Sequence, residues 1–167
     1  MSILVNDHIS ISEKLKSFGL ALPNGLTIIP SNLATANSLN ELRQQVESDT
    51  VRTLLRQNNI TYYELFEEED QPPYLQQYSF EWYGPTLIIS AGLLTQDPNA
   101  LSITLGLITN YLYDLFKGSK GGKASLDVIY QNKDGSCKEI HYSGPHEGLP
   151  QIYDIVKELE KSQNATN

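Results

Sequence analysis

The architecture of this chain follows from residues 123–143, KASLDVIYQNKDGSCKEIHYS, in which two alternating runs flank the turn sequence KDG. A three-residue loop, with Gly135 in the left-handed conformation that glycine adopts at least cost, puts the large side chains of both runs on one face. Under this loop the opposed residues are Leu126 with Tyr142, Val128 with Ile140 and Tyr130 with Lys138. A two-residue loop would instead set Val128 opposite His141 and mix the two faces. We therefore expect a β-hairpin with the three-residue loop.

The other face of the hairpin carries polar side chains that could form a reactive set. They are Cys137, Glu139, His141 and Ser143, with Asp127 directly across from His141. A catalytic thiol needs its base within hydrogen-bond reach, but positions 137 and 141 of one strand lie about 13 Å apart at about 3.3 Å per residue. We therefore expect an exposed hairpin face with an Asp127–His141 contact and without thiol catalysis.

Three other polar motifs also lack the spacing that chemistry requires. The loop KGSKGGK, residues 117–123, has Lys117 where a phosphate-binding P-loop needs its first glycine, and it leads from a helix into a strand. His146 and Glu147 are expected to be polar residues at a helix entry, and EEED, residues 67–70, a solvated loop. The sequence thus assigns no catalytic residue, no metal ligand and no cofactor.

Secondary-structure signals on both sides of the hairpin indicate alternating helices and strands. Apolar stripes predict a small helix around Ile11 to Phe18 and a last helix over residues 149–161. A capping box at Ser38 and Glu41 predicts a helix that begins there and ends near Asn58, with a kink or break on the way. Strands are expected at residues 26–29, 60–66 and 78–83, where Gly84 and Pro85 end the run. Residues 86–94 are expected to form a strand or a short helix.

Together these elements predict an α/β (α+β) fold in a single domain, residues 1–161, followed by a disordered polar tail, residues 162–167. We expect a two-layer sandwich: a mixed sheet of about five strands that ends in the C-terminal β-hairpin, with three main helices mostly on one face. The length of 167 residues agrees with one domain, since domains commonly have about 100 to 200 residues.

The central helix is the most unusual segment of the sequence. Residues 84–113 contain one charged residue, Asp97. Asp97 and Pro98 are a helix start signal that divides this run, so a continuous membrane span is not expected, and a helix is predicted from about Pro98 to Lys117. Its first face is apolar, and its second face is small and weakly polar where a surface helix would carry Lys or Glu.

This second face is the first candidate interaction site. Its members are Ser102, Gly106, Thr109, Asn110 and Tyr113. The lack of charge indicates that the face is covered, either within the chain, by a protein partner or second copy, or by lipid. The small residues Ser102 and Gly106, spaced by four, permit close helix–helix approach.

A second candidate surface is rich in tyrosine. Tyr74, Tyr78, Trp82 and Tyr83 fall within ten residues of one another. Aromatic side chains with polar tips suit recognition surfaces, and they equally suit half-buried strands. A pocket in this region with two or more titratable groups would favour a small-ligand binder or an enzyme, whereas a flat surface would count against both.

Composition narrows the choice of partners. Twelve Lys and Arg against 20 Asp and Glu give a net charge of −8, which opposes nucleic-acid binding. The single Cys137 excludes an internal disulfide and a multi-cysteine zinc site, and it agrees with a reducing cytoplasmic location. The first residues lack the pattern of a secretory signal.

Residues 84–161 are similar to a family of small accessory proteins of bacterial conflict systems, the effector-associated constant components. The similarity lies in the uncharged helix LGLITNYLYDLFKG, the hairpin LDVIYQNKDGSCKEIHYS and the final helix that begins GLPQIYDIV. It implies a non-catalytic adaptor that helps to assemble a defence effector, sometimes through a membrane-like helix. The chain departs from this pattern where Asp97 and Pro98 interrupt the apolar run. No functional residue carries over from the resemblance.

The sequence therefore favours a non-enzymatic interaction or adaptor module of a bacterial cytoplasmic system, assembling through the uncharged helix. The alternatives are a small-ligand binder or enzyme at the tyrosine-rich region, and a peripheral membrane protein.

Overall fold

The hairpin organises the sheet as the sequence predicts. In the computed structural model, which describes residues 1–75, 80–119 and 121–165, strands β7 (Ala124–Gln131) and β8 (Cys137–Gly144) pair antiparallel. Val128 lies opposite Ile140, and Asp127 lies opposite His141. Gly135 has φ +90°, and the Asn132 N–H donates to the Ser136 carbonyl at 2.8 Å, so residues 133–135 form the expected three-residue loop.

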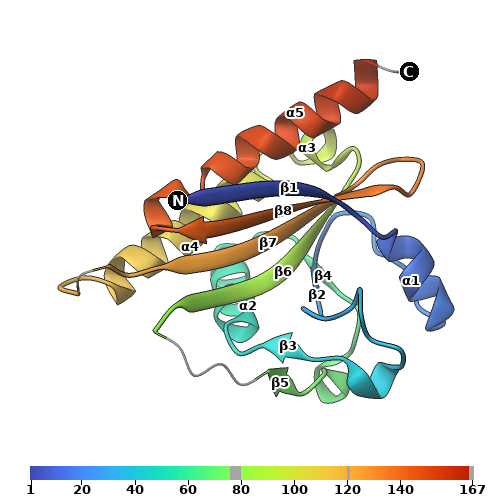
Figure 1. Ribbon diagram of the computed structural model, residues 1–167, viewed down its shortest axis with the longest axis horizontal. Helices are drawn as coiled ribbons and strands as arrows, with labels where there is room; N and C mark the ends of the chain where they lie inside the picture. Colours follow the sequence, from blue (N-terminus) through green and yellow to red (C-terminus); the bar gives the residue numbers. More distant parts are fainter. Residues whose placement is uncertain (76–79, 120, 166–167) are drawn as a thin grey trace.

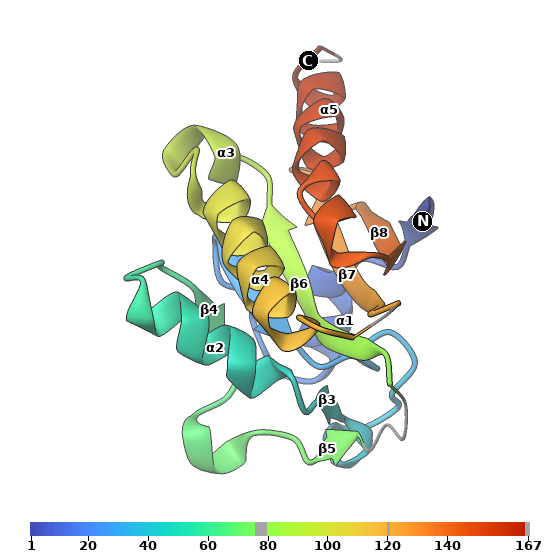
Figure 2. The same ribbon diagram turned by 90° about the vertical axis from the view of Figure 1, so that its left-hand side faces the viewer.

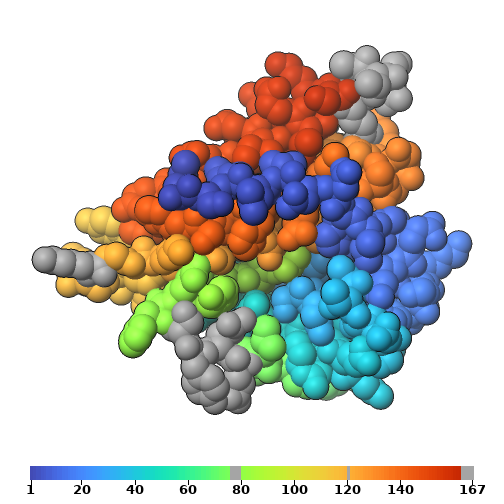
Figure 3. All heavy atoms as spheres, in the orientation of Figure 1, coloured from blue at the N-terminus to red at the C-terminus, as the bar shows by residue number. Residues whose placement is uncertain are grey.

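The main sheet is mixed and has six strands where the sequence predicts about five (Figure 1). Their order is β1-β8-β7-β6-β2-β4, with β6 and β7 parallel to each other and β2 and β4 parallel to each other. The remaining strands of this sheet are β1 (Ser2–His8), β2 (Leu26–Ile29), β4 (Tyr63–Glu64) and β6 (Trp82–Ser90). A separate parallel pair is formed by β3 (Gln44–Gln45) and β5 (Tyr74–Leu75). The edge strand β1 runs along the surface (Figure 3).

Three long helices cover one face of the sheet. They are α2 (Ser48–Gln57), α4 (Ala100–Leu115) and α5 (Gln151–Ala165), with α4 between the other two (Figure 2). The short α3 (Leu93–Gln96) precedes α4, so the uncharged run forms the crossover between the parallel strands β6 and β7. On the other face, α1 (Ile11–Ser17) and residues 30–42 cover part of the sheet.

The two faces draw on alternate residues of β7. Val128 and Tyr130 belong to the core beneath the three long helices, whereas Ile129 packs with Ile11 and Cys137 on the α1 side. Successive side chains of a strand point to opposite faces of the sheet. Because buried residues of β7 point to both faces, the strand contributes to a core on each side. Beyond the part that α1 covers, the second face carries Asp127 and His141, whose side chains are about one-third exposed.

The prediction that a helix begins at Ser38 is wrong. Residues Leu39–Glu41 form one turn of 3₁₀ helix without a side-chain cap from Ser38, and α2 begins at Ser48, after β3. Glu41 does reach back, but its carboxylate accepts the N–H of Asn37 at 2.7 Å, so the expected reciprocal bonds do not form. Helix α2 ends at Gln57, close to the predicted end.

The strand boundary predicted at Gly84 and Pro85 is also wrong. Strand β6 runs through both residues, and its register with β7 shifts between Tyr83 and Thr86. A Cβ on Gly84 would lie 2.6 Å from the Trp82 ring, so glycine serves close packing here, and the irregular register accommodates the proline. The predicted strand also includes residues 78 and 79, which lie outside the described residues.

Other boundaries also differ from prediction. Helix α5 runs to Ala165, so it extends beyond the predicted end at residue 161 and into the predicted tail. The strand expected at residues 60–66 shortens to Tyr63–Glu64. Helix α4 begins at Ala100 after Asn99, and Asp97 provides a backbone acceptor for the Ala100 N–H at 3.2 Å and not the predicted side-chain cap. The start signal therefore placed the helix correctly but assigned the capping group wrongly.

We predict that Gly135→Ala lowers the free energy of unfolding by about 1 to 2 kcal/mol. Gly135 has a positive φ, and an alanine Cβ is sterically strained by about this amount in the left-handed region. Chemical denaturation of Lys133→Ala, an exposed change in the same loop, provides the control and should show little effect. Equal stabilities of Gly135→Ala and wild type would mean that the loop adopts another conformation.

Candidate functional site

The first candidate site is the outer side of α4. The inner side of this helix packs into the core with Leu101, Leu105, Ile108 and Leu112, all fully buried. Of the predicted interaction residues, Ser102, Asn110 and Tyr113 are exposed, and Gly106 and Thr109 are partly exposed. The structure thus brings the five predicted residues together on one surface. Within the part of the chain that the structure describes, no layer buries them.

The polar groups of this face are satisfied within the helix. The Thr109 hydroxyl donates to the Leu105 carbonyl at 2.7 Å, and the Ser102 hydroxyl donates to the Asn99 carbonyl at 3.2 Å. Because these hydroxyls donate to carbonyls of the preceding turn, they can face an apolar surface without leaving an unsatisfied hydrogen-bond donor. The face can therefore be covered at small desolvation cost.

Gly106 has no role in the packing of the chain itself. A Cβ built on it meets nothing within 4 Å, and its φ lies outside the range that favours glycine. Glycine in a helix interior costs about 1 kcal/mol relative to alanine. Contacts within the chain therefore do not explain why α4 has a destabilising glycine in its middle.

Exposed apolar side chains lie on the same side of α4 as this glycine. Ile103 is 43% exposed and Tyr113 59%. The neighbouring helices instead expose charged residues, such as Arg56 on α2 and Lys157 on α5. An uncharged centre with a charged rim is the usual composition of a protein–protein interface. We call the outer residues Ser102, Ile103, Gly106, Thr109, Asn110 and Tyr113 the α4 face.

The predicted tyrosine-rich surface does not form as one surface. Trp82 is buried in the core, and Tyr78 lies outside the described residues. Tyr83 donates from its hydroxyl to Glu81 at 3.1 Å, beside a cavity of about 180 Å³ that Trp82 also lines. Tyr74 is exposed and donates to the Asp49 carboxylate, which raises the pKa of Tyr74 because the phenol is stabilised in its protonated form.

Tyr74 does line a charged cavity of about 440 Å³ beside α2. The other lining residues are Gln44, Asp49, Arg52, Arg56, Glu64, Glu68 and Gln71. Arg52 is 7% exposed, and its guanidinium pairs with Glu64 and with Asp49, the latter at 2.7 Å. The cavity thus contains several titratable groups, the feature that favours a small-ligand site in this region.

Gln44 is an unusual member of this cavity. Its side chain is nearly buried, at 4% exposure, and its amide nitrogen donates to the Pro72 carbonyl at 2.7 Å. Its amide oxygen accepts no hydrogen bond from the described residues. A buried acceptor without a donor costs free energy, so a ligand N–H or O–H at this position would be stabilising.

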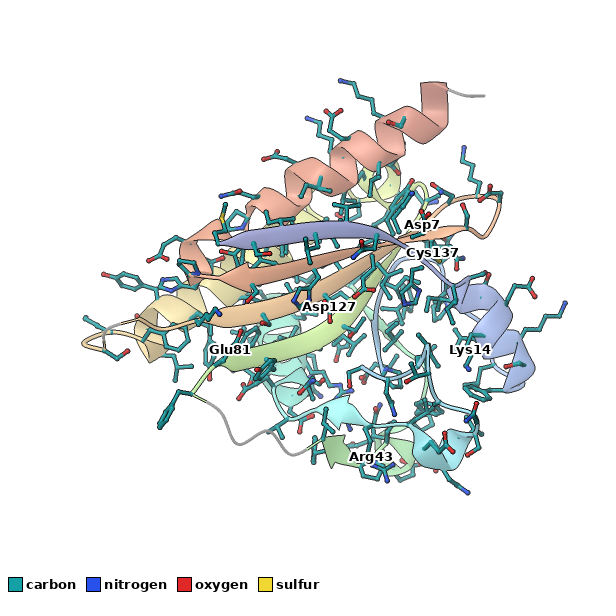
Figure 4. The ribbon with its side chains drawn as sticks, in the orientation of Figure 1. Asp7, Lys14, Arg43, Glu81, Asp127 and Cys137 are labelled. Carbon is teal, nitrogen blue, oxygen red and sulfur yellow. The ribbon has the colours of Figure 1, made fainter. Side chains whose placement is uncertain are left out.

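The open face of the sheet holds a further polar cluster that sequence reasoning found only in part. Glu81, labelled in Figure 4, precedes β6. Its carboxylate accepts from the Ser125 hydroxyl at 2.6 Å and from the Ser143 hydroxyl at 3.5 Å. Burial alone would raise the pKa of Glu81, but these hydrogen bonds, that of Tyr83 and the charge of Lys123 outweigh it and lower the pKa. The expected contact of Asp127 with His141 is confirmed at 2.5 Å.

A cavity of about 480 Å³ lies at the carboxyl ends of β6 and β7, between α1 and the hairpin loop. It is lined by Lys16 and Lys133 among polar and small residues, and it includes none of the sequence-predicted site residues.

Comparison with known proteins identifies no relative: no family model, curated protein or solved structure matches the chain. Among the described helices, none is long and apolar enough to cross a membrane.

Cys137 is expected to react slowly in the folded protein. The thiol is 3% exposed, and burial raises its pKa, so the reactive thiolate is scarce at neutral pH. Iodoacetamide should label the native chain at least about tenfold more slowly than the unfolded chain. A matched control moves the thiol one position, to the exposed site of Ser136→Cys in a Cys137→Ser background, where labelling should be fast. Fast labelling of the native Cys137 would contradict its placement in the α1 core.

Proposed function

We propose that the chain is a non-catalytic interaction module that assembles through the α4 face, and that this face binds the α4 face of a second copy. The observation that carries the proposal is Gly106, a helix-interior glycine with open space where its side chain would be, in the middle of an uncharged exposed surface. A glycine at a crossing point lets two helix axes approach closely, at the lower end of the usual 8 to 10 Å or below it. Close approach of a helix from a second copy would explain why position 106 is a glycine.

The α4 face is complementary to itself. In an antiparallel crossing centred on Gly106, positions 102 and 110 are equally distant from the centre, so Ser102 of one copy faces Asn110 of the other. A hydroxyl and a carboxamide can each donate and accept. Ile103 likewise faces Thr109, which offers a methyl group. A two-fold pairing therefore joins compatible groups at each position.

Charge also favours this face for self-association. Two chains with a net charge of −8 repel one another, and this repulsion is smallest where charged groups are absent. Between Asp97 and Asp114 the sequence has no charged residue. The α4 face is thus the part of the three-helix layer where two copies meet without opposing like charges.

The cellular role follows the resemblance of residues 84–161 to effector-associated components of bacterial conflict systems. We propose a bacterial cytoplasmic adaptor whose self-assembly presents a defence effector in more than one copy. The uncharged helix that carries the resemblance is also the proposed assembly element.

Gly106→Leu tests the proposal in a single variant. The wild-type chain should associate with rising concentration in sedimentation equilibrium, and Gly106→Leu should weaken association at least about tenfold by blocking the close approach. The same variant should fold at least as well as wild type, because leucine is a better helix former and the position is open. Thr53→Leu, which adds the same side chain at an exposed site of α2, is the matched control and should leave association unchanged.

A wild-type chain that stays monomeric at high concentration would overturn the proposal. So would a Gly106→Leu variant that associates like wild type.

A second candidate function, small-ligand binding, is favoured by the unsatisfied acceptor of Gln44 in the charged cavity. Arg56 also lines this cavity, and no ion pair joins it to a carboxylate within the described part of the chain. A ligand with an acidic group for Arg56 and an N–H or O–H donor for Gln44 would satisfy both. Amino acids and hydroxy acids have this chemistry.

Saturation-transfer NMR with a panel of amino acids and hydroxy acids tests this second candidate. Binding by the wild type that is lost in Arg56→Gln would support it, with Lys157→Gln on α5 as the control for loss of a positive charge elsewhere. The absence of binding by every member of the panel, or signals that persist in Arg56→Gln, would count against it.

A further inference from the structure

Three metal-ligating side chains converge on the open face of the sheet. They are Asp127 of β7 with Glu139 and His141 of β8, and their donor atoms all lie within 4.8 Å of one another. The His141 Nδ1 and an Asp127 oxygen are 2.5 Å apart. Figure 4 looks onto this face, and Asp127 lies near its middle.

The register of two adjacent strands fixes this arrangement. Asp127 and His141 are directly opposed, and Glu139 lies two residues before His141, so all three side chains leave the same face. Both strands are inside the sheet, with β1 and β6 on their outer sides. Sites on such strands are held more firmly than sites on loops. Asp127 and His141 are about one-third exposed, so water and ions reach the cluster.

The cluster contains two carboxylates, and its one basic side chain is His141, which contacts Asp127. Within residues 1–75, 80–119 and 121–165, no lysine or arginine forms an ion pair with Asp127 or Glu139. The nearest basic residue along β8, Lys138, points to the other face and pairs with Asp7 of β1. Two carboxylates at this separation repel each other, and a bound divalent cation would remove that repulsion.

We infer that Asp127, Glu139 and His141 form a binding site for a divalent transition-metal ion, with Zn²⁺ as the best match. One imidazole nitrogen and two carboxylate oxygens are ligands that Zn²⁺ accepts, at about 2.0 to 2.2 Å from the metal. Ligand atoms at that distance from the metal are about 3.3 Å from one another in a tetrahedral site. Side-chain rotations that move the donor atoms by about 1 Å would give the present cluster this spacing. Water would complete the coordination, as in zinc sites with three protein ligands.

This inference is independent of assembly through the α4 face, which lies on the opposite side of the sheet. The hairpin pattern predicts these residues on one face, but the distance of about 13 Å between positions 137 and 141 excludes only a Cys–His pair and does not bear on a metal site that uses Asp127, Glu139 and His141. Glu139 distinguishes the two interpretations: an isolated Asp127–His141 contact does not need it, whereas a metal site does.

Isothermal titration of the tag-free, chelator-treated protein with Zn²⁺ tests the site. The wild type should bind one equivalent saturably, and Glu139→Gln, Asp127→Asn and His141→Ala should each weaken binding at least about tenfold. The remaining two histidines provide matched controls, so His8→Ala and His146→Ala should bind like wild type. Thermal unfolding with and without Zn²⁺ gives a second readout: the metal should raise the Tm of wild type but not of Glu139→Gln.

Three results would overturn the inference. They are the absence of saturable Zn²⁺ binding, binding that survives Glu139→Gln with wild-type affinity, and binding that is lost in His8→Ala or His146→Ala. Glu139→Gln keeps the shape of the side chain at a partly exposed position, so a folded variant is available for the decisive comparison.

Discussion

The pairing of β7 with β8 and β6 is the constraint that organises this molecule. Strand β7 lies between its hairpin partner β8 and the parallel strand β6, and it is buried on both faces for most of its length. A slip of one residue would turn Val128 and Tyr130 away from the helices and bring Asp127 into the core. The three-residue loop at Gly135 fixes this register, and with it the helix layer on one face and the polar cluster on the other.

Sequence reasoning succeeds where local pattern and tertiary packing agree. The hairpin, the strand at residues 26–29 and the helix α1 have strict periodicity or a clear turn signal, so their positions could be derived. It fails at Ser38, where a capping box is present but the chain enters a strand pair with β5 that no local pattern indicates. It fails at Gly84 because the glycine serves a contact with Trp82, and the sequence shows only a turn-forming dipeptide.

The candidate sites divide in the same way. The α4 face could be predicted because an absence of charge over a whole helix face is visible in one sequence. The cavity around Arg52 could not, because its lining comes from α2, β3, β4 and β5, which are brought together by long-range packing. The contact of Glu81 with Ser125 spans 44 positions and was likewise out of reach of local patterns. The open space at Gly106 depends on the tertiary structure and is not visible in the sequence.

Isotope-filtered NMR can show whether two copies meet through the α4 face. In a mixed sample of ¹³C-labelled and unlabelled chains, only contacts between copies give filtered cross-peaks. If the copies join through the α4 face, cross-peaks are expected from the Ile103 methyl groups to α4 residues of another copy, around Thr109. Cross-peaks confined to the exposed edge strand β1, or none at a concentration where the chain associates, would show that another surface joins the copies.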